Sequence, residues 1–214
     1  MIARIEELDW QPTRMGDLTL RRRTDPATGE LIYEVKLGEE FLMSSLFTVA
    51  EEELSTLGLA AASGDRLDVL VGGLGLGYTA VTALADELQV SATLVRDERT
   101  TLIHDDFFAV ARREPGADDR GYDVILLDVD HSPRHTLDPS HADLYTVAGL
   151  TALRGHLRPG GVFALWSDDP TDEPFLRDLE TVFGTAAAHE VRFANRLTGG
   201  TSANTVYVAT TSEA

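Results

Sequence analysis

An apolar run that passes directly into a glycine turn constrains the fold of this chain most. Residues 66–73 read RLDVLVGG, and the turn GLGLG at 73–77 leads into YTAVTAL. Such a run is typical of a parallel strand covered on both faces. Glycines let a backbone approach a ligand closely, while the N–H groups of a following helix point at it. The predicted cofactor-binding residues of this turn are Gly72, Gly73, Leu74, Gly75 and Gly77.

The spacing of the glycines narrows the class of ligand. A dinucleotide fingerprint places its third glycine three residues after the second, whereas Gly77 follows Gly75 by two. No Gly-Lys-Ser/Thr sequence follows the turn. The pattern favours an S-adenosylmethionine-type ligand over NAD or ATP, and the alternative is a tight strand-to-helix turn that binds nothing.

The remaining apolar runs indicate an α/β chain. Strands are predicted at 100–104, 123–128 and 161–166, with a helix over 142–156 between the last two. Runs of this kind alternating with helices are typical of a parallel sheet covered on both faces. A final hairpin through the turn 197–200 predicts an antiparallel last strand. We therefore expect a Rossmann-like, doubly wound, mostly parallel sheet.

The N-terminal part has a different pattern. Residues 13–37 alternate as strands do around a turn at 25–29, which predicts a β-hairpin. From Phe41 to Leu59 the apolar spacing becomes helical, and Gly64 closes the segment. The predicted domains are 1–64, a hairpin plus a helix, and 65–214, the ligand-binding domain.

Charge and composition limit the partners. The 214 residues carry 36 acidic against 18 Lys and Arg side chains, a net charge of −18 that opposes binding to nucleic acid or an anionic membrane. A small cationic substrate is the easier partner. Without cysteine, thiolate catalysis and zinc-thiolate sites are excluded. The acidic opening MIARIEELDW does not resemble a signal peptide, so a cytoplasmic location is expected.

Two acidic motifs follow predicted strands at the edge where open α/β sheets bind ligands. Asp105, Asp106 and Phe107 follow the strand at 100–104. We predict that Asp106 accepts from an adenine amino group beside Asp105, with Phe107 as an apolar wall; the alternative is capping of a helix. Asp128 ends the most apolar strand and is predicted to be the catalytic acid or base.

Further polar residues lie near Asp128 in the sequence. Asp130 and His131 follow it before Pro133, and Asp168 follows the next strand. We expect Asp130, His131 and Asp168 to contact the substrate, with turn formation or helix capping as the alternatives. No metal ion is expected at this edge.

In order and over most of its length, the chain resembles the spermidine synthase (polyamine aminopropyltransferase) family. The matching segments are the N-terminal hairpin, EEFLMSSLF, LVGGLGLG, HDDFFAV, YDVILLDVDHSP and LYTVAGLTALRGHLRPGGVFALWSDDP. The resemblance implies a two-part subunit, usually a homodimer. It also implies transfer of an aminopropyl group from decarboxylated S-adenosylmethionine to an amine. Asp128 matches the family's catalytic acid, and Tyr145 is assigned to the substrate site.

The chain departs from that family at two informative positions. Gly75 stands where the family carries an aspartate near the donor's amine, so the donor can be ordinary S-adenosylmethionine. His131 stands where the family has a second acid, so the acceptor can differ. Two other functions stay open: a methyltransferase, including a cation-dependent O-methyltransferase using Asp128 and Asp168, and a non-catalytic nucleoside-binding protein.

The interval before the strand at 100–104 is short. Between Leu84 and Thr100 only ADELQVSATLVRDER is present, whereas a parallel crossover needs a dozen or more residues between strands. The expected ribose-binding acid is also missing there. We expect either a deletion or, as we favour, a join across an absent segment near Val90-Ser91, with a long backbone gap between Asp86 and Asp97.

Overall fold

The computed structural model describes residues 5–84, 97–116 and 120–212. The chain divides into two compact units, 1–48 and 49–214. The division lies closer to the N-terminus than the boundary expected near Gly64. Helix α1 (Val49–Ala60) packs against the sheet of the second unit and therefore belongs to that unit.

The first unit is a four-stranded antiparallel sheet in the order β1-β2-β3-β4. Its strands are β1 (Ile5–Thr13), β2 (Gly16–Thr24), β3 (Leu31–Leu37) and β4 (Glu40–Ser44). The predicted hairpin corresponds to β2 and β3, and its turn is closed by a hydrogen bond from Gly29 N to Asp25 O of 2.9 Å. The prediction of a helix from Phe41 was wrong for its first part. Phe41 and Met43 instead lie in β4 and pair with β3. The backbone N–H and C=O groups on that edge of β3 therefore have hydrogen-bond partners.

The second unit contains a mixed five-stranded sheet in the order β5-β6-β7-β9-β8. Its strands are β5 (Val69–Gly72), β6 (Tyr122–Leu127), β7 (Leu157–Ser167), β8 (Gly184–Asn195) and β9 (Gly200–Thr211). The first three strands are parallel, and β9 is antiparallel to both β7 and β8. The predicted fold class, with its antiparallel last strand, is confirmed.

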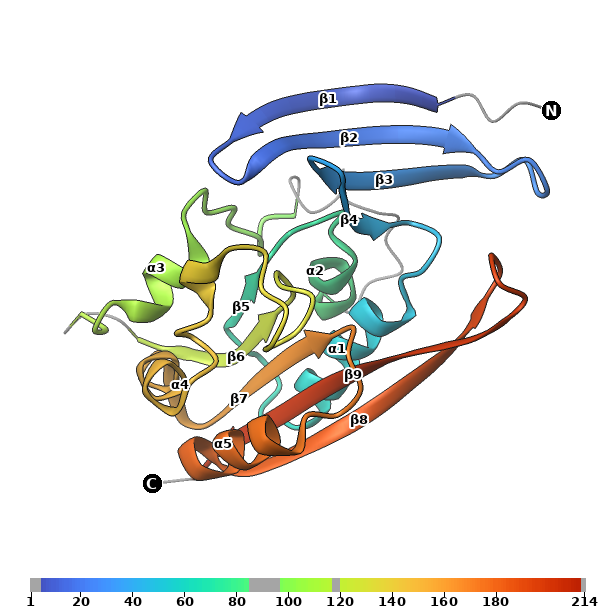
Figure 1. The fold of residues 1–214 in the computed structure, drawn as a ribbon. Helices are drawn as coiled ribbons and strands as arrows, with labels where there is room; N and C mark the ends of the chain where they lie inside the picture. Colours follow the sequence, from blue (N-terminus) through green and yellow to red (C-terminus); the bar gives the residue numbers. More distant parts are fainter. Residues whose placement is uncertain (1–4, 85–96, 117–119, 213–214) are drawn as a thin grey trace. The chain divides into compact units, whose positions relative to one another are not determined.

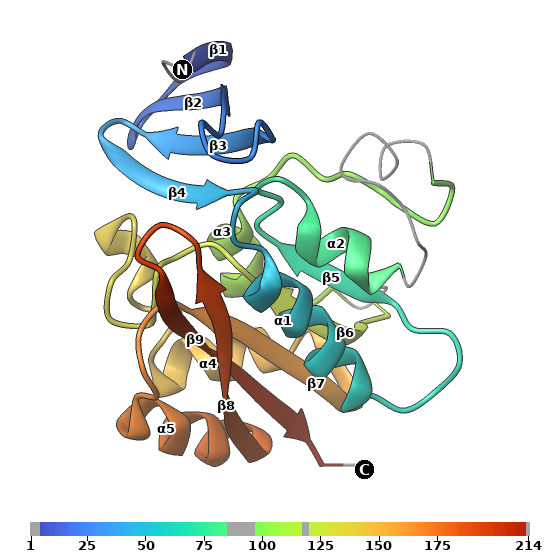
Figure 2. The ribbon, with the colours of Figure 1, turned by 90° about the vertical axis from the view of Figure 1, so that its right-hand side faces the viewer.

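Helices cover both faces of this sheet (Figures 1 and 2). Helix α1 packs on one face, where Ala50 and Leu54 contact a cluster with Leu126 and Ala164. The opposite face is covered by helices that share a second cluster with Leu127 and other residues of the sheet. The helices of this unit besides α1 are α2 (Tyr78–Ala83), α3 (Phe107–Arg112), α4 (Val147–Arg154) and α5 (Glu173–Phe183), with a 3-10 turn at Pro139–His141.

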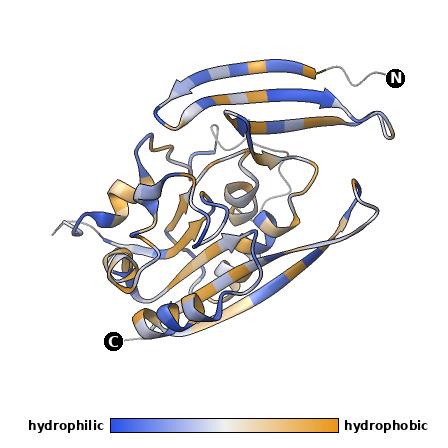
Figure 3. Cartoon of the chain, in the orientation of Figure 1, coloured by the Kyte–Doolittle hydropathy of each residue, from blue (hydrophilic) through white to orange (hydrophobic). Residues whose placement is uncertain are grey.

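The central strand β6 contains the fully buried apolar run that the sequence predicted. Val124, Ile125, Leu126 and Leu127 are all completely buried, as a parallel strand between two helical layers must be. Figure 3 shows this hydrophobic run in the middle of the second unit. No helix of the described residues is long and apolar enough to cross a membrane.

Two predicted elements differ from the structure. The stretch 100–104 is not a strand: Leu102 and Ile103 are 52% and 65% exposed, and no described strand pairs with β5 on its free side. A strand over 100–104 would need a neighbouring strand as partner for its backbone N–H and C=O groups, and the described residues supply none. The helix expected from residue 142 begins only at Val147, because Thr146 caps it by accepting from Gly149 N. The join expected near Val90-Ser91 lies outside the described residues.

Candidate active site

The glycine turn lies against the end of the neighbouring strand β6. Asp128 N donates to Gly72 O at 2.9 Å, so the backbone pairing continues past the last residues of β5 and β6. Gly73 has φ +86°, and a Cβ atom there would lie 1.9 Å from Asp128 O. Only glycine allows this approach. The predicted turn and the predicted catalytic acid are therefore in direct backbone contact.

An aromatic ring covers the other side of the turn. A Cβ atom on Gly72 would lie 2.5 Å from the ring of Phe107, so the half-buried Phe107 packs directly on the glycine backbone. Phe107 is thus an apolar neighbour of the turn, and its role as a wall for an adenine ring stays a prediction. Leu74 and Gly75 are exposed, and Gly77 closes the turn by donating to Leu74 O at 2.7 Å. Leu74 does not fill the space beside Asp128.

Asp128 carries a perturbed carboxyl group. Thr79 Oγ1, at the start of α2, donates to Asp128 Oδ2 across 3.4 Å. Burial raises the pKa of Asp128 to about 6, because the ionised form loses solvation, and the hydrogen bond from Thr79 offsets this only in part. A carboxyl with a pKa near neutrality both accepts and returns a proton readily.

Glu51 carries a second perturbed carboxyl group, which the sequence analysis did not single out. It lies in the first turn of α1, and its pKa is raised to about 8 by burial and then by the negative charges of Asp128, Glu52 and Asp168. Three consecutive acids at a helix start look like an ordinary solvated N-terminus. The available signal was the spacing: Ala50, Leu54 and Gly58 mark the buried face of this helix, and Glu51 borders it.

Asp130 and Tyr145 are buried and hydrogen-bonded to each other. Asp130 is 1% exposed and accepts from Leu137 N at 2.7 Å, His141 Nδ1 at 2.9 Å and Tyr145 Oη at 2.7 Å. Tyr145 is buried as well, and its pKa is raised mainly by that burial. The expected substrate contacts of Asp130 and Tyr145 are therefore corrected. Both side chains hold the loop after β6 in shape.

His131 and Asp168 connect the loops after β6 and β7. Asp168 N donates to His131 O at 2.7 Å, and the Asp168 carboxylate accepts from Asn204 Nδ2 at 2.7 Å. Asp168 itself is exposed at this edge. It does not cap the next helix; that role belongs to Asp172, whose side chain accepts from Phe175 N. The structure thus brings His131 and Asp168 together, and both remain substrate-site predictions.

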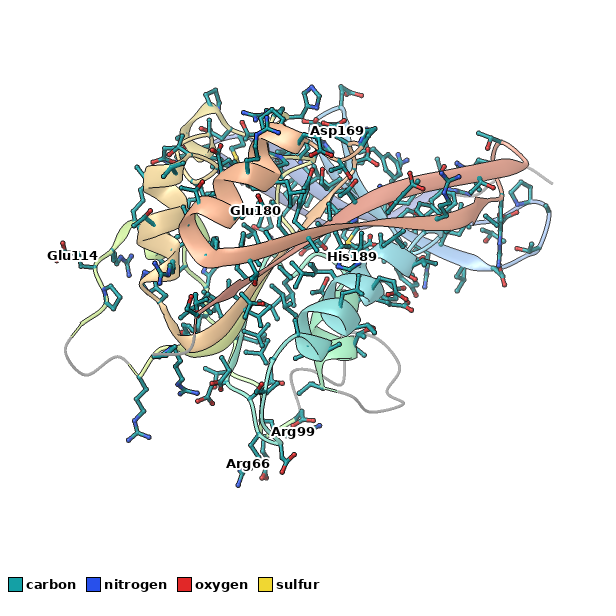
Figure 4. All side chains as sticks on the ribbon, turned by 90° about the horizontal axis from the view of Figure 1, so that it is seen from below. Arg66, Arg99, Glu114, Asp169, Glu180 and His189 are labelled. Carbon is teal, nitrogen blue, oxygen red and sulfur yellow. The ribbon has the colours of Figure 1, made fainter. Side chains whose placement is uncertain are left out.

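Asp169 reinforces this connection. Its Oδ2 accepts from Ser132 Oγ at 2.6 Å and lies 2.7 Å from His135 Nδ1. These contacts lower the pKa of Asp169, with the Ser132 hydrogen bond as the largest cause. Figure 4 shows Asp169 at one end of the second unit and Arg66, which precedes β5, at the other. The two loops are fixed to each other at the carboxyl edge of the sheet.

The structure gives Asp106 the capping role that was the alternative. Asp106 is exposed, and its Oδ1 accepts from Phe108 N at 2.9 Å and Ala109 N at 3.2 Å. Asp105 lies beside it and pairs with Arg113 at 3.2 Å. The predicted adenine contact of Asp106 is therefore corrected to an N-cap of α3, because its Oδ1 accepts from two of the free N–H groups at the helix start.

We expect Asp106→Ala to lower the free energy of unfolding by about 1 kcal/mol, the usual cost of losing an N-cap. Asp106→Ser should restore most of the loss, since serine also caps. Thermal denaturation of the three proteins measures this. Equal stability of Asp106→Ala and the wild type would contradict the capping role.

Among the described residues, no group of three or more His, Asp and Glu side chains is arranged to hold a metal ion.

The second unit has a Rossmann-like fold, which it shares with solved structures of spermidine synthases and a methyltransferase, and the glycine turn lies at the carboxyl edge of its sheet. Spermidine synthase from Thermotoga maritima matches 95% of this chain and 72% of its own, with a TM-score of 0.67 and 16% identity. A spermidine synthase in complex with the transition-state analogue AdoDATO matches the same shares, with a TM-score of 0.65 and 13% identity.

A methyltransferase is also similar. Human methyltransferase-like protein 13 in complex with SAH matches 76% of this chain and 82% of its own, with a TM-score of 0.56 and 18% identity. No protein-family model and no curated protein sequence matches the chain. These likenesses identify the fold.

Proposed function

We propose that this protein transfers an aminopropyl group from decarboxylated S-adenosylmethionine to an amine, with Asp128 as the acid or base. The observation that carries the proposal is the backbone contact between the glycine turn and Asp128. Burial raises the pKa of the Asp128 carboxyl to about 6, which suits an acid or base. The fold shared with spermidine synthases supports it.

The chemistry needs one nucleophile and one base. The acceptor nitrogen attacks the carbon next to the sulfonium, a C–N bond forms, and the C–S bond breaks. The electron pair of that bond leaves on sulfur, which gives neutral methylthioadenosine. Asp128 takes the proton that the nitrogen loses, so charge and atoms balance. General-base help of this kind is worth about 100-fold or more in rate.

Methyl transfer on the same fold is the second candidate. Gly75 supplies no carboxylate near the turn, and a methyltransferase is among the similar structures. In that case the sulfonium would give its methyl group to the acceptor and leave S-adenosylhomocysteine.

The product distinguishes the two reactions. The protein is incubated with butane-1,4-diamine and either decarboxylated or ordinary S-adenosylmethionine, and the nucleoside product is separated by chromatography. We expect methylthioadenosine with the decarboxylated donor. S-adenosylhomocysteine with the ordinary donor would support methyl transfer, and the absence of both products would contradict a transferase acting on this amine.

The pH dependence follows from Asp128. As a general base it must be ionised, and its pKa is about 6. We expect kcat/KM to fall as the pH is lowered through about 6, approaching tenfold per pH unit below it. Steady-state rates between pH 4.5 and 8 test this. A flat profile down to pH 5 would exclude Asp128 as the titrating base.

A further inference from the structure

Strand β8 is a long edge of the five-stranded sheet, and no described strand lies on its outer side. It runs through 12 residues, most of them exposed, and pairs with β9 without a bulge. In an antiparallel sheet, the N–H and C=O groups of alternate residues point to the outer side of such a strand. A long, regular edge of this kind is a template for a further strand.

The other edge strands carry features that oppose pairing. Strand β1 has a bulge between Glu7 and Asp9 and a proline at position 12. Strands β4 and β5 are short, with 5 and 4 residues. Bulges, prolines, charges and short length are the usual means by which proteins block edge pairing. Strand β8 has no bulge, proline or lysine, so it is the described edge that is most open to a partner strand.

The outer part of the β8–β9 hairpin lacks support from the rest of the sheet. Strand β9 pairs with β7 only over 205–210, but it pairs with β8 over its whole length. The segments 191–195 and 200–204 therefore form a two-stranded ribbon that projects beyond β7 (Figure 1). Two strands alone are marginally stable in water, so a third strand along β8 would stabilise this ribbon.

The charges of β8 permit contact with a second copy of the chain. The strand carries one acid, Glu190, and one arginine, Arg192, in a chain whose net charge is −18. Like charges on two copies repel each other, whereas the two charges of β8 cancel. Strand β1, in contrast, carries Glu6, Glu7 and Asp9 without a basic residue, so two copies of β1 would repel each other.

The same two charges select a register for the pairing. Glu190 and Arg192 lie on one face of β8 and form an ion pair within the chain. When two copies of β8 run antiparallel about a two-fold axis at Val191, each Glu190 lies opposite Arg192 of the second copy. In this register the projecting segment 191–195 of one copy lies opposite 187–191 of the other, so each sheet supports the ribbon of its partner.

We infer that β8 is an interface between two copies of this chain, which pair antiparallel through this edge and join their sheets into one continuous sheet. The backbone of β8 supplies the hydrogen bonds, and the facing pairs of Glu190 and Arg192 set the register. The inference does not depend on the proposed transferase activity, because β8 contributes no residue to the candidate active site.

Sedimentation equilibrium from micromolar to submillimolar concentration tests the interface. We expect the wild type to reach twice the mass of one chain. Arg192→Glu and Glu190→Arg each place like charges opposite one another and should weaken dimerisation about tenfold or more. An equimolar mixture of the two variants should recover the wild-type affinity, because every facing pair then carries opposite charges. Both variants lack the ion pair within the chain, so recovery in the mixture comes from contacts between copies.

Two surface variants serve as matched controls. Glu114→Arg and Arg66→Glu make the same charge changes at exposed positions, and Figure 4 shows both residues away from His189 of β8. Both controls should dimerise as the wild type does. A wild type that sediments as a single chain at every concentration would overturn the inference. Dimerisation that none of the β8 variants weakens would overturn the role of β8, and a mixture that stays as weak as its components would contradict the antiparallel register.

Discussion

Asp128→Asn is expected to lower kcat about 100-fold or more, while methylthioadenosine binding stays within a few-fold of the wild type. The asparagine keeps the size of the side chain and a partner for Thr79 Oγ1, now 3.4 Å from Asp128 Oδ2, but it cannot take up a proton. A loss of this size corresponds to about 2.7 kcal/mol of transition-state stabilisation.

Two further measurements test whether the loss of activity in Asp128→Asn comes from the loss of the base. Thr79→Val removes the hydrogen bond to Asp128 and should change kcat far less than Asp128→Asn does. Asp128→Asn should also lose the fall in rate near pH 6, because the titrating group is gone. An asparagine variant as active as the wild type would remove Asp128 from the mechanism.

Asp130→Ala is expected to be the most destabilising single change at this edge, with a loss of about 3 to 5 kcal/mol in the free energy of unfolding. The substitution leaves His141, the Tyr145 hydroxyl and Leu137 N without their buried acceptor. These are three hydrogen-bond donors, and each buried donor left unsatisfied costs about 1 to 3 kcal/mol. Chemical denaturation followed by circular dichroism measures it.

A matched control lies in the same loop. Asp143 pairs with Arg112 on the surface, with 57% of its side chain exposed, so Asp143→Ala should cost less than about 1 kcal/mol. Tyr145→Phe removes one of the three bonds to Asp130 and should cost about 1 kcal/mol without changing KM. A large rise in KM for Tyr145→Phe at unchanged stability would restore Tyr145 to the substrate site.

The parts of the fold predicted correctly are those that local pattern determines. The fully buried run of β6, the glycine turn and the final hairpin each carry a signal within a few residues, and the structure confirms all three. The segment after Phe41 was wrong at its start because pairing with β3 outweighed a helical spacing. The stretch 100–104 has the composition of a strand but no described neighbour to pair with.

The candidate site was predicted only in part, because only some of its residues carry a signal in the local sequence. Asp128 could be found because a charge directly after an apolar strand is conspicuous. Asp130 follows the same strand, but its carboxylate is hydrogen-bonded to His141 in the loop that follows. No spacing in the sequence reveals this contact. Glu51 was missed because it is separated from Asp128 by 77 positions, and only the packing of α1 on the sheet brings the two charges together.

Binding of a nucleoside decides whether this protein uses an S-adenosylmethionine-type donor. Methylthioadenosine is titrated calorimetrically into the wild type and into Asp128→Asn. We expect saturable binding near one nucleoside per chain in both proteins, with turnover lowered only in the variant. Absence of binding in the folded wild type would contradict a transferase that uses an S-adenosylmethionine-type donor.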